Sequence, residues 1–227
     1  MTGDGSVIEV KTSAASLVKH RAIKATSKIY DYDDVSPFAL DKALYLEDKK
    51  VQEAERLRQA AYVQTGDAIA TEVEATARSR RVWNDTFQTS LASRLEDDAF
   101  IYDGRSFIRS DRIPAQFIPI ALEHEVMEVV YGSFEAQRDR DDIITKLGLS
   151  GFCRDQPNEK AHFVAMVHEL NKANQLGLLD QWLVFRDVKD QKEIAGCNSL
   201  QRVQHLVNQQ EARQYTAGLI RTMDTKK

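Results

Sequence analysis

Residues 117 to 131 read Phe-Ile-Pro-Ile-Ala-Leu-Glu-His-Glu-Val-Met-Glu-Val-Val-Tyr, an apolar stretch that predicts a helix. On this helix His124 and Glu128 are four residues apart, so their side chains lie on one face, one turn apart. An imidazole and a carboxylate at that spacing can bind one divalent metal ion. Glu125 projects about 100° away around the helix axis. In the related His-Glu-x-x-His helix, the glutamate at that position is the general base that activates a metal-bound water.

A metal site needs a third protein ligand, and the best candidate is His162, 38 residues after His124. His162 falls in the first turn of a second predicted helix, Glu159–Leu176. Two histidines and one carboxylate, with a position left open for water, suit zinc, and they also suit iron or manganese. Glu169 lies on the same helix face as His162 and could orient an imidazole or act as an alternative ligand. His168 points elsewhere on that helix and is a weaker candidate.

The competing interpretation of this segment is a solvated helix face without chemistry. In that case His124, Glu125 and Glu128 only face water, and the motif is a chance match in a chain with five histidines. The apolar residues of the helix would then pack inward, namely Leu122, Val126, Val129 and Val130.

The motif His124-Glu125-x-x-Glu128, followed by Ala161-His162-x-x-Ala165 and Glu169, resembles a group of prokaryotic and phage zincin-like proteins. Those proteins pair a His-Glu-x-x-Glu helix with a later Ala-His-x-x-Ala helix. They often carry a short strand pair around an Asp/Gly turn ahead of the first helix. The sequence Tyr-Asp-Gly-Arg at residues 102–105 would supply that turn here.

The resemblance covers about residues 98–185 and implies a minimal metallopeptidase-like fold. It implies metal ligands at His124, Glu128 and His162, and a catalytic base at Glu125. The chain departs from the family pattern in the longer segment between its two motif helices, where a helix near Ile143 is added.

The whole chain is predicted to be mainly α-helical with a small β element. Two long helices, Pro37–Gln64 and Asp67–Leu95, are expected to fold back as a hairpin around a Thr-Gly-Asp break. Ala99–Ile108 is expected to form two short strands around an Asp-Gly turn. Further elements are a short helix ending at Leu147, an apolar strand or docking segment at 182–185 and a last helix at 200–223. We therefore divide the chain into an N-terminal helical hairpin region at 1–97, a zincin-like core at 98–185 and a C-terminal helical extension at 186–227.

The composition narrows the partners that we expect. The net charge is −4, with no block of lysine and arginine, so nucleic acid is not an expected partner. The sequence has no apolar run that would span a membrane and no signal peptide pattern, and its two cysteines are expected to be reduced, so we expect a cytoplasmic protein. A peptide or protein substrate fits the motif, and self-association through the N-terminal hairpin stays open.

The predicted function is a metal-dependent, peptidase-like hydrolase that uses a divalent metal, with zinc favoured and manganese or iron as alternatives. One rival is a non-enzymatic helical interaction protein, from a phage or another mobile element, whose His-Glu cluster is structural or incidental. A second rival is a helix-turn-helix DNA-binding protein, because residues 142–150 resemble the first helix and turn of that motif.

Overall fold

The computed structural model describes residues 37–154 and 156–224, with side chains from 45 to 223. The chain divides into two units, Met1–Asp48 and Lys49–Lys227. The described part of the first unit is residues 37–48, which are helical and belong to α2. None of the helices in the described ranges is both long and apolar enough to cross a bilayer. The helices are α2 Pro37–Gln59, α3 Gly66–Ser79, α4 Asp85–Arg94, α5 Ile118–Gly132, α6 Gln137–Lys146, α7 Pro157–Gln175, α8 Leu179–Gly196 and α9 Leu200–Asp224.

Three short strands form the small β element, and together with the helices they confirm the predicted fold class. β2 (Ala99–Tyr102) and β3 (Arg105–Arg109) are antiparallel, as the sequence predicted. The turn between them is Asp103-Gly104, and both residues have positive φ, 51° and 68°, as a tight hairpin turn requires. β1 (Tyr62–Gln64) pairs in parallel with the other side of β3, so the order is β1-β3-β2 and β2 lies at an edge.

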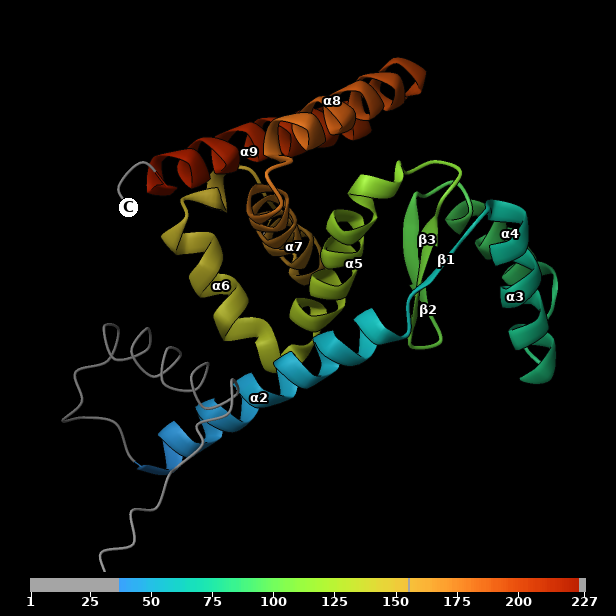
Figure 1. Ribbon diagram of the computed structural model, residues 1–227, viewed down its shortest axis with the longest axis horizontal. Helices are drawn as coiled ribbons and strands as arrows, with labels where there is room; N and C mark the ends of the chain where they lie inside the picture. The colour runs from blue at the N-terminus through green and yellow to red at the C-terminus, as the bar shows by residue number, and fades with distance from the viewer. Residues whose placement is uncertain (1–36, 155, 225–227) are drawn as a thin grey trace, which may run out of the picture. The chain divides into compact units, whose positions relative to one another are not determined.

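Helix α5 lies between the sheet and α7, which places the His-Glu motif at the centre of this unit (Figure 1). α5 begins where the sequence predicts, with Pro119 in its first turn, where the missing N–H has no helical partner to lose. Ile120, Val126 and Val130 of α5 are buried. α7 matches its predicted span closely, and Gly177 follows it in the left-handed conformation with φ 69°.

Helices α8 and α9 pack on each other and on α7 (Figure 1). The predicted last helix is confirmed as α9. The prediction of a strand or docking segment at 182–185 is wrong, because these residues belong to α8. Leu179, Trp182 and Leu183 recur at helical spacing and are all buried, so they form the inner stripe of a helix.

The predicted N-terminal hairpin of two long helices is also wrong. α2 ends at Gln59, residues 62–64 form strand β1, and α3 and α4 replace the second helix. Tyr62 and Val63 have aromatic and β-branched side chains, and pairing with β3 stabilises them as a strand despite the helix-forming residues around them. The side chain of Asn84 accepts a hydrogen bond from the Phe87 amide and starts α4 as a new helix.

The three-part domain division stays a prediction. Two observations bear on it: the sheet joins residues on both sides of the first boundary, and α8 runs across the second.

Candidate metal centre

Helices α5 and α7 bring the three predicted ligands together. Nε2 of His124 lies 3.2 Å from Nδ1 of His162, and both are close to the carboxylate of Glu128. Oε2 of Glu128 is 3.2 Å from Nδ1 of His162 and 3.3 Å from Nε2 of His124. The three donor atoms thus form a nearly equilateral triangle, and the group could hold a metal ion.

The size of this triangle fits a metal ion. In a tetrahedral zinc site with bonds of about 2.0–2.1 Å, neighbouring ligand atoms are about 3.3–3.4 Å apart. The observed separations of 3.2–3.3 Å are close to that value. The described part of the chain supplies three donors to the group, which leaves a fourth position for water or substrate.

The competing interpretation requires His124 to face water. The structure contradicts this for His124, because its side chain is only 12% exposed. That interpretation is correct for Val126 and Val130, which pack inward, but Val129 is 38% exposed. Val126 and Val130 therefore lie on a different side of α5 from His124 and Glu128, while the buried Ile120 is one turn before His124.

Two of the three donors are in the protonation state that binds a metal ion, and the third, His124, would have to lose a proton. Burial lowers the pKa of His124, but the carboxylates of Glu169 and Glu128 more than compensate and raise it to about 10 in the metal-free protein. Burial raises the pKa of Glu128, yet hydrogen bonds from the two histidines bring it well below its usual range. Burial keeps the pKa of His162 below its ordinary value. Glu128 is thus ionised and His162 neutral, which is the form in which each can bind metal.

Glu169 of α7 holds the other side of the His124 ring. Its Oε2 lies 2.6 Å from Nδ1 of His124, and the indole N–H of Trp182 donates to its Oε1 at 2.9 Å. Glu169 is only 2% exposed, so this buried carboxylate is placed to orient the imidazole and leave Nε2 for the metal. His168 packs against Tyr131 in a tilted arrangement, with ring centroids 5.4 Å apart, and is not one of the three donors.

A broad cleft of about 1830 Å³ opens over the donors, and Glu125 lines it together with His124, Glu128 and His162. Desolvation by the surrounding protein raises the pKa of Glu125 to about 7, and the charge of His124 opposes that rise only in part. A carboxylate with such a pKa can both accept and return a proton near neutral pH. One wall of the cleft is strand β2, through Ala99, Phe100 and Ile101.

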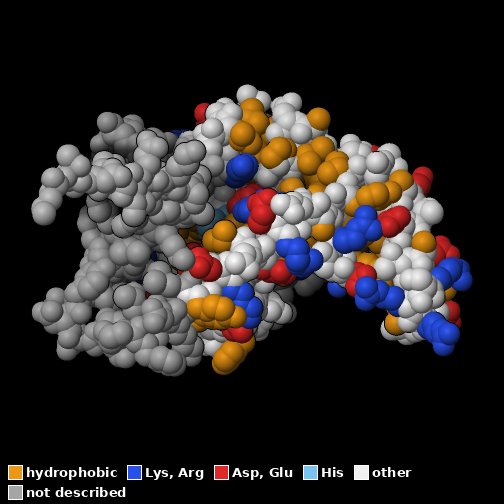
Figure 2. All heavy atoms as spheres, turned by 60° about the horizontal axis from the view of Figure 1, so that its bottom comes forward, with side chains coloured by type: hydrophobic (Ala, Val, Ile, Leu, Met, Phe, Trp, Pro, Cys, Tyr) orange, Lys and Arg blue, Asp and Glu red, His pale blue; other side chains and the backbone are white. Residues whose placement is uncertain are grey.

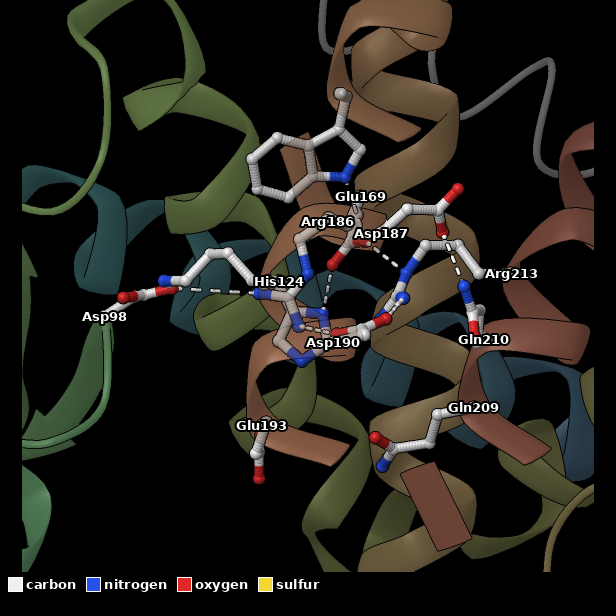
Figure 3. A network of polar contacts seen from close by, with 12 residues as sticks. Asp98, His124, Glu169, Arg186, Asp187, Asp190, Glu193, Gln209, Gln210 and Arg213 are labelled. Atoms are coloured by element: carbon white, nitrogen blue, oxygen red, sulfur yellow. Dashed lines mark hydrogen bonds and ion pairs between the residues drawn. The ribbon is translucent and has the colours of Figure 1, made fainter. Parts of the chain in front are cut away.

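Sequence reasoning missed Trp182 and Arg213, which contact Glu169. It also missed Asp190, which pairs with Arg213 (Figure 3). They come from α8 and α9, helices that carry no recognisable motif. A buried arginine in a polar helix has no local sequence signal, because only the folded structure shows which carboxylates it contacts.

Comparison with known protein families, with curated proteins and with solved structures found no match to this chain. The resemblance to zincin-like proteins therefore rests on the short motifs alone.

Proposed function

We propose that this chain is a metal-dependent hydrolase of the peptidase type, with zinc as its metal. One observation carries the proposal: the donor atoms of His124, Glu128 and His162 converge to 3.2–3.3 Å, and the three residues line a cleft. Structural zinc sites are usually closed by four protein ligands, whereas catalytic sites keep a position open. Three donors beside an open cleft therefore favour catalysis over a structural clip.

When bound, the metal would act as a Lewis acid that lowers the pKa of water and polarises a substrate carbonyl. Glu125 is the residue that takes the proton from the attacking water and passes it to the leaving amine. Its pKa of about 7 suits both transfers. Glu169 keeps Nδ1 of His124 occupied, so that Nε2 faces the other two donors.

A peptide substrate is supported by the position of β2. This strand lies at the edge of the sheet and lines the cleft. The carbonyl of Ile101 in β2 accepts a hydrogen bond from the Arg94 side chain at 3.2 Å, which an added peptide strand would replace. Edge strands of this kind bind extended peptides by adding them to the sheet. A peptide bound in this way would run along the wall of the cleft.

The charge distribution gives less support to the DNA-binding rival. On the face that Figure 2 shows, acidic and basic side chains are interspersed and do not gather into one basic surface. DNA-binding surfaces attract phosphates through clustered lysine and arginine.

The first test is the metal content of the purified protein, measured by mass spectrometry on the wild type, His124→Ala and His168→Ala. His168 is on the same helix as His162 but outside the donor group, so His168→Ala is the matched control. We expect near-stoichiometric metal in the wild type and the control, and its loss in His124→Ala. A wild-type protein that takes up no zinc, manganese or iron would refute the proposal.

The second test is hydrolysis of an unfolded protein such as casein by the metal-loaded protein. Glu125→Gln should keep its metal and lose activity by about 10²–10⁴-fold, the usual contribution of a general base. A Glu125→Gln protein as active as the wild type would exclude Glu125 as the base. A metal-loaded wild type that cleaves no peptide would favour the non-enzymatic rival.

A further inference from the structure

The side chain of Arg213, on α9, is buried beside the candidate metal centre. It is 1% exposed, and its Nη1 donates to Oδ2 of Asp190. Its Nε lies 3.5 Å from Oε1 of Glu169, the carboxylate that contacts His124. Arginine is almost never fully buried unless it is paired, and here it stands between two buried carboxylates.

The contacts divide the two oxygens of Glu169 between different partners. Oε2 contacts His124, while Oε1 contacts Arg213 and accepts the indole N–H of Trp182 (Figure 3). Oε1 thus accepts a hydrogen bond from α8 and lies 3.5 Å from the buried guanidinium of α9, and this leaves Oε2 facing Nδ1 of His124. The orientation of the imidazole therefore depends on residues two contacts away from the donors.

The partner of Arg213, Asp190, takes part in a further ion pair. Asp190 also lies 3.7 Å from Arg186, one turn earlier on α8, and Arg186 lies 3.9 Å from Asp98 beside β2. The series of charged contacts thus runs from the edge strand of the sheet to α9 and reaches Glu169 last.

We infer that Arg213 is a positioning residue of the metal centre, which holds Glu169 and through it sets His124 for metal binding. The inference rests on the proposed function, since it assumes that the three donors bind a metal. By this inference α9 contributes to metal binding through Arg213 and is not only a C-terminal extension of the fold.

A purely structural role explains Arg213 less well. Arg221 and Asp180 also join α9 to α8, at 2.5 Å and near the surface, with side chains 49% and 83% exposed. Removing arginine and carboxylates from water is expensive, and apolar residues of similar volume usually give equal or better stability. The burial of Arg213 beside Glu169 is therefore better explained by its effect on the position of the Glu169 carboxylate.

The test is titration of the metal-free protein with Co²⁺, followed by its visible absorption, together with Zn²⁺ affinity measured against a chelator. We compare the wild type with Arg213→Met, which keeps length without charge, and Arg213→Lys, which keeps charge. Arg221→Met is the matched control, because it also removes an ion pair between α9 and α8. Changes to the outer partners of metal-binding histidines commonly weaken binding by about 10–100-fold.

We expect Arg213→Met to weaken Zn²⁺ binding by about tenfold or more and to alter the Co²⁺ spectrum. Arg213→Lys should recover much of the affinity, and Arg221→Met should match the wild type. If Arg213→Met does not fold, as judged by circular dichroism, Arg213→Gln takes its place with the same expected result. If Arg213→Met has the Zn²⁺ affinity and Co²⁺ spectrum of the wild type, this inference is wrong and the proposed function is unaffected. The same holds if Arg221→Met loses as much Zn²⁺ affinity as Arg213→Met. A wild type that binds neither ion would overturn the proposed function as well.

Discussion

Zinc binding should release a proton from His124, and the amount can be worked out from the structure. In the metal-free protein the carboxylates of Glu169 and Glu128 raise the pKa of His124 to about 10, although burial alone would lower it. A metal ion binds only the neutral imidazole, so it must displace that proton. The perturbation is Glu169→Gln, which removes the largest favourable charge beside the ring and keeps the side-chain shape.

The difference in proton release between the wild type and Glu169→Gln is largest at a pH where a histidine with an ordinary pKa is already neutral. At pH 8 a group with a pKa of about 10 is about 99% protonated, whereas a histidine with a pKa of about 6.5 is about 3% protonated. The wild type should therefore release close to one proton from His124 on binding zinc, and Glu169→Gln should release much less. Because protons compete with zinc, the affinity of the wild type should rise with pH more steeply than that of the variant between about pH 7 and 8.5.

The assay is isothermal titration calorimetry in buffers of different ionisation enthalpy at pH 8. The slope of the observed enthalpy against the buffer enthalpy gives the number of protons released. Any proton lost from water at the metal is released by both proteins, so it cancels in the difference between them. Equal proton release by the wild type and Glu169→Gln would refute the argument that this carboxylate holds His124 in its charged form.

Three further predictions concern stability and can be checked by urea unfolding. Leu57→Ala should lower the free energy of unfolding by about 2–5 kcal/mol, because Leu57 is fully buried behind α5, whereas Val51→Ala, at a side chain 54% exposed, should change it by less than about 0.5 kcal/mol. Gly104→Ala should destabilise by about 1 kcal/mol or more, since φ is +68° and a Cβ would lie 3.2 Å from a guanidinium nitrogen; Gly196→Ala, where a Cβ meets nothing, should be neutral or stabilising. Trp182→Phe removes a hydrogen bond to a buried carboxylate and should lower the unfolding free energy by about 1.5–3 kcal/mol, and a smaller change than 0.5 kcal/mol would contradict that assignment.

The parts of the fold that sequence predicts well are those with strong local signals. The Asp103-Gly104 turn, Pro119 at the start of α5 and Gly177 after α7 each mark a boundary that the structure has. The spacing of His124 and Glu128 places both donors on one helix face for the same local reason. The prediction of His162 as the third ligand depends on how two helices pack. The structure places Nδ1 of His162 3.2 Å from Nε2 of His124.

The parts that sequence does not predict depend on contacts between distant segments. Residues 62–64 lie among good helix formers, and only pairing with β3 makes them a strand. Arg213 resembles an exposed residue of a polar helix until α9 packs on α7 and α8. α2 shows the same limit, because the apolar side chains of Ala54 and Leu57 are buried while that of Val51 is 54% exposed, and the sequence alone does not separate them.

The two-helix origin of the donors has a consequence for protein engineering. Among the described residues, the three donors and the carboxylate beside His124 come from α5 and α7, so the pair could be copied onto another helical scaffold. In a scaffold that received only α5 and α7, the buried carboxylate of Glu169 would have no cation beside it. The scaffold would need an arginine at the position that Arg213 of α9 occupies here. A designer would therefore need to graft α9 and also α8, which supplies Trp182 and Asp190, although only α5 and α7 supply ligands.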